Sequence, residues 1–99
     1  MKNALIINRE DNVAVLTEDA VKGEEIVCRG SGSELSLFAA CDIPVYHKVA
    51  VRDIPKGSRV LKYGEVIGIA TADIAAGEHV HTHNVESAGR TDTAGSEVQ

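Results

Sequence analysis

Short runs of apolar residues, separated by charged or glycine-containing segments, recur along the whole chain. Val and Ile dominate these runs, and apolar and polar positions alternate in Asn12–Val15 and in Val49–Arg52. Such runs are typical of half-buried strands. No segment sustains helical spacing over about ten residues, so one turn of helix within Leu35–Ala40 is the most that the pattern allows. Strands are predicted at Ala4–Ile7, Val13–Leu16, Ile26–Cys28, Leu35–Phe38, Val49–Val51, Val60–Leu61, Val66–Ile69 and around Val80.

A turn pattern is repeated between these strands. An Asp is followed by Ala or Ile, and in most copies by a Gly four residues after the Asp; the copies begin at Asp19, Asp42, Asp53 and Asp73. Gly supplies the positive φ that tight turns need, and Pro at an early turn position presets its own φ. Each copy therefore predicts a buried apolar residue, a tight turn and a new strand. The last three copies start 11 and then 20 residues apart, which excludes a solenoid of fixed period.

The character of the chain changes near its C-terminus. Beyond Glu86 there is one large apolar residue, Val98, too little to offset the entropy of ordering such a segment. We expect one domain over residues 1–86 and a flexible polar tail over residues 87–99.

Three of the four histidines lie at alternate positions in Gly77–Asn84. On a strand His79, His81 and His83 would share one face, with neighbouring side chains about 7 Å apart at their roots. Two such imidazoles can converge on one divalent cation, because metal–nitrogen bonds are about 2.1 Å long, and imidazole suits transition metals better than Mg²⁺ or Ca²⁺. The alternatives are an exposed polar face, a hydrogen-bonding cluster or an interface. The same strand has no carboxylate to complete a metal triad, so a complete site would need groups from elsewhere.

Two further segments carry candidate chemistry. His47 and Lys48 place an imidazole beside an ammonium just before a predicted strand, and Lys62 and Tyr63 lie between two predicted strands. The alternative interpretation of His47 and Lys48 is an exposed loop. The alternative for the second segment is that Tyr63 fills the core and Lys62 is solvated. The segment Arg29–Ser33 lacks the spacing of a phosphate-binding loop and is interpreted as a hairpin loop.

Composition narrows the classes of function. Aromatic residues make up 3% of the chain, and 10 basic against 15 acidic residues give a net charge of −5. Both features disfavour a nucleic-acid partner. No apolar run approaches the roughly 20 residues of a membrane helix, and the N-terminal run is too short for a signal peptide. Two cysteines without metal-ligand spacing indicate free thiols and a cytoplasmic location.

The order of several short motifs resembles that of a known family. These motifs are Asp11–Val15, His47–Ala50, Asp53-Ile54, Lys62–Gly64 with Ile67-Gly68, and Gly77–Asn84. Over about residues 8–86 the chain resembles the SAF-type domain of altronate and galactarate dehydratases. It is also similar to the small subunit of sulfolactate sulfo-lyase. The Arg29–Ser33 loop and the polar tail depart from the common pattern and favour a free-standing small subunit.

The resemblance implies a mostly β, β-clip fold: a small antiparallel domain with a long bent hairpin. It implies a lyase acting on a hydroxylated or sulfonated acid, with most of the catalytic apparatus in a separate large subunit. His81 and His83 become candidates for proton transfer and for metal ligation, with His79 as a third candidate ligand. His47, Lys48, Lys62, Tyr63 and Asn84 become candidates for substrate binding. The expected cofactor is a divalent transition metal such as Fe(II), and the large subunit is a candidate for supplying most of its ligands.

Three hypotheses follow for the whole chain. The first is the small subunit of a dehydratase acting on altronate or galactarate, completing or covering the active site of the large subunit. The second is the small subunit of a (2R)-sulfolactate sulfo-lyase, and the third is a non-enzymatic β-clip module that binds carbohydrate or protein. The thin core and exposed strand edges predict that the isolated chain self-associates or binds the large subunit. We expect no lyase turnover from the chain alone.

Overall fold

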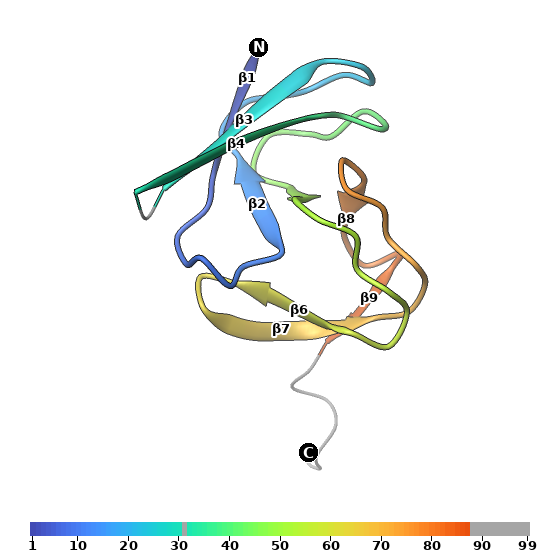
Figure 1. The fold of residues 1–99 in the computed structure, drawn as a ribbon. Helices are drawn as coiled ribbons and strands as arrows, with labels where there is room; N and C mark the ends of the chain where they lie inside the picture. The colour runs from blue at the N-terminus through green and yellow to red at the C-terminus, as the bar shows by residue number, and fades with distance from the viewer. Residues whose placement is uncertain (31, 88–99) are drawn as a thin grey trace.

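The computed structural model describes residues 1–30 and 32–87, and Figure 1 shows them as strands joined by loops. The strands are β1 (Lys2–Leu5), β2 (Val13–Leu16), β3 (Glu25–Gly30), β4 (Ser33–Phe38), β5 (Lys48–Ala50), β6 (Arg59–Lys62), β7 (Glu65–Ala70), β8 (His79–Val80) and β9 (Val85–Ser87). Within these residues there is no helix, so the turn of helix allowed at Leu35–Ala40 does not form. The mostly β prediction is confirmed. Ser87 ends β9, and the rest of the predicted tail, residues 88–99, lies outside the described residues.

The strands form two sheets. The larger has the order β4-β3-β1-β2-β5-β8, and the smaller has the order β6-β7-β9. All pairs are antiparallel except β1 with β3, which is parallel, so the domain is mostly antiparallel, as expected, with one parallel pair. The chain first forms the β1–β2 pair and then crosses to place β3 on the other side of β1. The β3–β4 hairpin pairs continuously from Glu25↔Phe38 to Gly30↔Ser33 and is the expected long hairpin.

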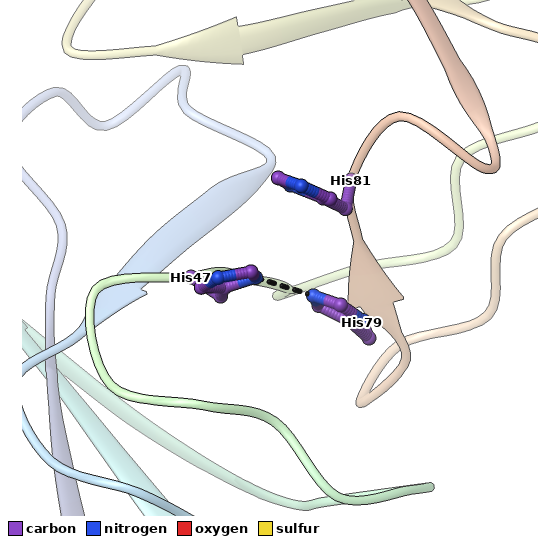
Figure 2. Close-up of side chains that lie close together, drawn as sticks. All are labelled: His47, His79 and His81. Carbon is purple, nitrogen blue, oxygen red and sulfur yellow. Dashed lines mark hydrogen bonds between the residues drawn. The ribbon is translucent and has the colours of Figure 1, made fainter.

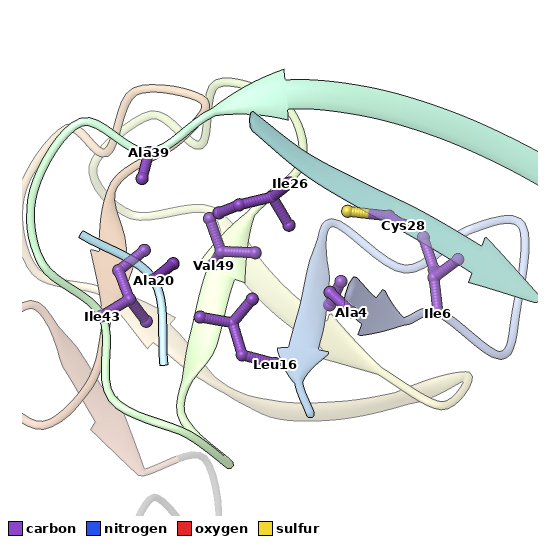
Figure 3. Close-up of a cluster of buried hydrophobic side chains, with 10 residues drawn as sticks. Ala4, Ile6, Leu16, Ala20, Ile26, Cys28, Ala39, Ile43 and Val49 are labelled. Atoms are coloured by element: carbon purple, nitrogen blue, oxygen red, sulfur yellow. The ribbon is translucent and has the colours of Figure 1, made fainter. Parts of the chain in front are cut away.

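Two apolar clusters fill the interior. The first lies in the larger sheet and contains Ala4, Ile6, Ala14, Leu16, Ala20, Ile26, Cys28, Ala39, Ile43 and Val49 (Figure 3). The second lies towards the smaller sheet and contains Val13, Ala50, Ile54, Val60, Ala70, Ile74 and Val80. None of these residues is aromatic, as the composition predicts. Burying one Val, Leu or Ile side chain contributes about 1.5–3 kcal/mol, so these small aliphatic groups supply the main stabilisation.

The repeated turns pair with one another, which the sequence alone did not predict. Ala20 bridges to Ile43, and Ile54 bridges to Ile74, both in antiparallel fashion. In each pair the Asp of one turn accepts a hydrogen bond from a backbone N–H of the other turn. The four bonds are Val45 N–H to Asp19, Lys22 N–H to Asp42, Lys56 N–H to Asp73 and Ala76 N–H to Asp53, at 2.7–3.0 Å. Each pair therefore locks two distant segments together.

Asp11 and Asn12 connect the two sheets. The fully buried Asp11 carboxylate accepts hydrogen bonds from the backbone N–H groups of Ile7 and Asn8 on one side and of Gly64 on the other, at 2.8–3.3 Å. The Asn12 side chain accepts a bond from Leu61 N–H at 2.7 Å and donates one to the Arg59 carbonyl at 2.9 Å. The β6–β7 hairpin is thereby fixed against the start of β2.

Candidate active site

The histidine segment is not a continuous strand. β8 ends at Val80, and residues 81–84 form a turn, so the prediction that His79, His81 and His83 line one strand face is wrong. Asn84 closes this turn: its side-chain oxygen accepts a bond from His81 N–H at 3.0 Å, and its side-chain nitrogen donates to the His79 carbonyl at 2.9 Å. Asn commonly bonds nearby backbone in this way and so competes with strand pairing.

His47 joins this segment from a distant part of the sequence. It precedes β5, whose antiparallel pairing with β8 sets Val49 opposite His79. His47 Nδ1 and His79 Nε2 lie 2.8 Å apart in a hydrogen bond, and the rings of His47 and His81 have centroids 4.6 Å apart. Figure 2 shows the three imidazoles of His47, His79 and His81 gathered between the two elements. We call these three residues the histidine trio.

His83 lies beside the trio, on a different side of it. Its ring is 5.3 Å from that of His79, and the two residues line a cleft of about 290 Å³ together with Ala40, Cys41 and Glu78. His81 lines a separate cleft. The turn after Val80 thus directs His81 and His83 to two different clefts.

Two members of the trio, His79 and His81, hold a proton weakly. Desolvation, together with charge repulsion from His47, His83, His81 and Lys48, lowers the pKa of His79 to about 4. The pKa of His81 is lowered as well, by partial desolvation and by His47 and Lys48. Both side chains are therefore neutral near pH 7, the state required of a metal ligand or a general base.

A cleft of about 270 Å³ combines charge with an apolar surface. Its lining residues are Lys48, Ile67, His81, Thr82, Val85 and Ser87. Burial lowers the pKa of Lys48, and the neighbouring Lys62 lowers it further. An ammonium, an imidazole and two hydroxyls around an apolar surface can bind a carboxylate or sulfonate by charge-assisted hydrogen bonds. We call this space the Lys48 cleft.

The other sequence candidates, Lys62, Tyr63 and Asn84, do not line the Lys48 cleft. The Lys62 Nζ lies 5.0 Å from the centre of the Tyr63 ring. Tyr63 and Gly64 form the β6–β7 turn, with φ of 56° and 81°, and Tyr63 is 42% exposed rather than a core plug. Asn84 is 6% exposed, and its amide is occupied by the backbone of the histidine turn. Asn84 therefore positions the histidines.

Sequence reasoning placed His47 next to Lys48 but missed its place in the trio. His47 and His79 are 32 positions apart, and only the β5–β8 pairing brings them together. The structural role of Asp11 was also missed. The sequence did offer a signal for this role: a charged residue, Asp11, lies two positions before a strand of the core and is followed by Asn12.

Within residues 1–30 and 32–87, no helix is long and apolar enough to cross a membrane. The two cysteines are free thiols, and burial raises the pKa of Cys28 to about 11. Cys28 is thus an unreactive core residue.

Comparison with known proteins supports the resemblance. Residues 2–88 match the family described as the altronate/galactarate dehydratase SAF domain. The chain is 44% identical over 81 residues to altronate dehydratase of Escherichia coli (strain K12), covering 82% of this chain and 16% of that protein. It is 37% identical over 87 residues to altronate dehydratase of Bacillus subtilis (strain 168), covering 88% of this chain and 17% of that protein.

A second kind of relative is much shorter. The chain is 43% identical over 61 residues to the (2R)-sulfolactate sulfo-lyase subunit alpha of Paracoccus pantotrophus, covering 62% of this chain and 91% of that protein. The chain thus spans about one sixth of the length of the altronate dehydratases it matches and nearly all of the sulfo-lyase subunit. On the match over residues 2–88, the chain belongs to the altronate/galactarate dehydratase SAF domain family.

Proposed function

We propose that this chain is the small subunit of a carbon–oxygen lyase that dehydrates a sugar acid such as altronate or galactarate. In this proposal it covers or completes the active site of a separate large catalytic subunit. The observation that carries the proposal is the juxtaposition of the Lys48 cleft with the histidine trio, which share His81. The names of the long relatives, altronate dehydratases, support the reaction class.

The division into two chains is supported by the Paracoccus relative, which is named as a subunit, and by the groups present. Dehydration beside a carboxylate breaks a C–H bond and a C–O bond, forms an enol that becomes a ketone, and releases water. It needs a base for the proton, an acid for the departing hydroxyl and a group that holds the carboxylate. The described residues offer imidazoles and an ammonium at one edge of the domain. The relatives that carry the dehydratase name are about six times as long as the matched region.

Each residue of the site has a role in this proposal. Lys48 binds the carboxylate of the substrate, and Lys62 adds positive potential nearby. His81 and His83, on either side of His79, transfer protons. Asn84 keeps the backbone of the histidine turn in place. Tyr63, exposed beside Lys62, is a contact for the substrate or the large subunit.

The experiment is co-expression with a candidate large lyase chain from the same organism, followed by assays of 2-keto acid formation and of sulfite release. Formation of a keto acid from altronate or galactarate by the complex, with none from either chain alone, supports the dehydratase. We expect Lys48→Ala to raise KM at least tenfold, while Lys22→Ala, at an exposed turn, leaves kinetics unchanged. A complex that consumes no hydroxy acid or sulfonate would refute the proposal.

A second candidate function is that of the small subunit of a (2R)-sulfolactate sulfo-lyase. The specific observation is that the Paracoccus relative, named as a subunit, is matched over 91% of its length. A sulfonate carries the same kind of anionic oxygens as a carboxylate, so the Lys48 cleft suits both. If the complex releases sulfite from sulfolactate and forms no keto acid from altronate or galactarate, the result supports the sulfo-lyase and not the dehydratase. Carbohydrate binding in the absence of either activity would instead indicate a non-enzymatic module.

Assembly and location belong to the same proposal. We infer that the isolated chain self-associates, or binds the large subunit, through its exposed apolar side chains and open strand edges. Light scattering on the purified chain, with and without the large subunit, measures this directly; a strict monomer that does not bind the large subunit contradicts it. The free thiols are consistent with the reducing cytoplasm, where we place the complex.

A further inference from the structure

The histidine trio has the spacing of a ligand set. The ring nitrogens that His47, His79 and His81 can offer all lie within 4.8 Å of one another. Two nitrogens bound to one ion at about 2.1 Å lie about 3.0–3.4 Å apart at the angles of tetrahedral or octahedral coordination. Small side-chain rotations would therefore suffice to bring the three nitrogens onto one ion. Among the described residues, this is the one group of three His, Cys, Asp or Glu side chains with such spacing.

The backbone around the trio already holds its members in place. His79 is fixed opposite Val49 by the pairing of β8 with β5. The Asn84 side chain binds the carbonyl of His79 and the N–H of His81, and so ties the two together. Outer groups that orient ligands in this way commonly raise metal affinity. His47 Nδ1 and His79 Nε2 already lie 2.8 Å apart in a hydrogen bond. An ion bound by both nitrogens would replace that bond, and the proton would move to the other nitrogen of the same ring.

We propose that His47, His79 and His81 together bind one divalent transition-metal ion in this chain. Three imidazoles favour Zn²⁺, Fe²⁺, Co²⁺ or Ni²⁺ over Mg²⁺ and Ca²⁺. Three protein ligands also leave a coordination position for an exogenous ligand, as is typical of catalytic rather than structural zinc sites. His81 lines the Lys48 cleft, which makes an anion bound in that cleft a candidate for this position.

His47 replaces His83 in the ligand set that spacing along the sequence suggested. His83 is outside the group whose nitrogens lie within 4.8 Å of one another, and it lines the other cleft with Cys41 and Glu78. This difference makes the proposal specific, because His83 is a matched control: it is a histidine of the same turn, exposed to solvent and next to His79.

The test is direct titration of the purified full chain with Zn²⁺ by calorimetry and with Co²⁺ by visible absorption. We expect one ion per chain and Co²⁺ d–d bands from nitrogen ligation. His47→Ala and His81→Ala should each weaken binding about 100-fold, whereas His83→Ala should change the affinity less than threefold. His47→Gln provides a second variant of similar size, and circular dichroism melting of every variant confirms that it is folded.

Three results would overturn the proposal. These are no saturable binding by the wild-type chain, unchanged affinity in the folded His47 variants, and a loss in His83→Ala as large as that in His81→Ala. The proposal deepens the proposed function by adding an ion to the same site: with the ion bound, His81 acts as a ligand and His83 is the group that transfers protons. The titration needs neither the large subunit nor turnover. Metal binding without lyase activity in the complex would leave the metal site standing and refute the lyase proposal alone.

Discussion

The two pairs of repeated turns have the same construction but different surroundings. In the first pair Ala20 and Ile43 belong to the apolar cluster of the larger sheet, and in the second Ile54 and Ile74 belong to the other cluster. Both pairs use reciprocal Asp-to-backbone hydrogen bonds. The difference is at the fifth residue of each turn. Three turns have Gly there, at φ of 88–94°, and the remaining turn has Tyr46 at φ of 70°.

Tyr46 is the residue that precedes His47. A non-glycine residue in the left-handed region costs about 1–2 kcal/mol, and such strain concentrates at functional sites. The side chain of Tyr46 is 76% exposed, so burial does not compensate for this cost. The comparison teaches that one turn design accepts either Gly or a strained Tyr at its fifth position. Both pairs lead to the histidine trio: the turn that ends at Tyr46 is followed by His47, and the turn that ends at Gly77 leads into β8, which begins at His79. They differ in that only the first does so through a strained non-glycine residue.

The largest effect is expected at Gly77, in the second pair. A Cβ on Gly77 would lie 2.4 Å from the Phe38 carbonyl oxygen, at a φ of +94°, whereas one on Gly57 would meet nothing within 4 Å at a φ of +88°. Gly77→Ala should therefore lower the free energy of unfolding by about 3 kcal/mol or more, and Gly57→Ala by about 1 kcal/mol. Urea denaturation of both variants checks this, and equal losses would show that backbone strain alone decides the cost.

The next effect concerns the link between the two halves. Asp11→Asn removes an acceptor oxygen from a fully buried site and should cost about 1–3 kcal/mol. Desolvation raises the pKa of Asp11, but hydrogen bonds from the backbone of Asn8, Gly64, Tyr63 and Ile7 together leave it below the ordinary value of 3.8. A lowered folded-state pKa contributes stability that is fully present above the unfolded-state pKa and is lost as pH falls through the folded value.

The difference in stability between wild type and Asp11→Asn should therefore be constant from pH 7 down to about pH 5 and shrink below about pH 4. Urea denaturation at a series of pH values measures it. A difference that grows on acidification would contradict the sign of the pKa shift.

A smaller loss of stability is expected when one Asp-to-backbone hydrogen bond is removed from either pair of turns, and the two pairs should differ in the effect on metal binding. Asp19→Ala and Asp73→Ala each remove one exposed hydrogen bond to the partner turn and should cost about 1 kcal/mol each. Asp19 accepts its bond from Val45, two residues before His47, while Asp73 accepts its bond from Lys56, nine residues after His47. Asp73 itself lies six residues before His79, but the pairing of β8 with β5 also holds His79 in place. Co²⁺ affinity should therefore fall about tenfold in Asp19→Ala and less than threefold in Asp73→Ala. Equal behaviour of the two variants would remove the functional distinction.

The smallest effect on stability is expected at Tyr46. Tyr46→Gly relieves the left-handed strain but adds backbone entropy to the unfolded chain, so the free energy of unfolding should rise by at most about 1 kcal/mol. Under the proposed function, loss of a Tyr46 contact with the substrate or with the proposed large subunit should raise KM or weaken complex formation. Thermal melting of the chain and kinetics of the proposed complex measure the two effects. A Tyr46→Gly variant with higher stability and unchanged activity would show that the strained conformation of Tyr46 does not contribute to function.

Local chemistry made much of the fold predictable. The predicted strand Val13–Leu16 coincides with β2, and those at Ile26–Cys28, Leu35–Phe38 and Val66–Ile69 lie inside β3, β4 and β7. The strand predicted at Ala4–Ile7 is shifted, since β1 covers Lys2–Leu5, and β9 was not predicted because Val85–Ser87 has a single apolar residue. The buried Ile residues and the positive φ of Gly23, Gly57 and Gly77 are as the turn pattern predicts.

The sequence by itself determined a mostly β domain with a core of Val, Ile, Leu and Ala, its turn positions and its family. These properties depend on residue spacing of two to five positions and on the composition of short motifs. The tertiary structure alone decided the parallel β1–β3 pair, the pairing of the turns and the membership of the histidine trio. His47 and His79 meet because β5 pairs with β8. His83 stays next to His79 but outside the trio, in the turn that the Asn84 side chain closes. Strand pairing joins residues that are far apart in the chain, and no local periodicity encodes which strands will pair.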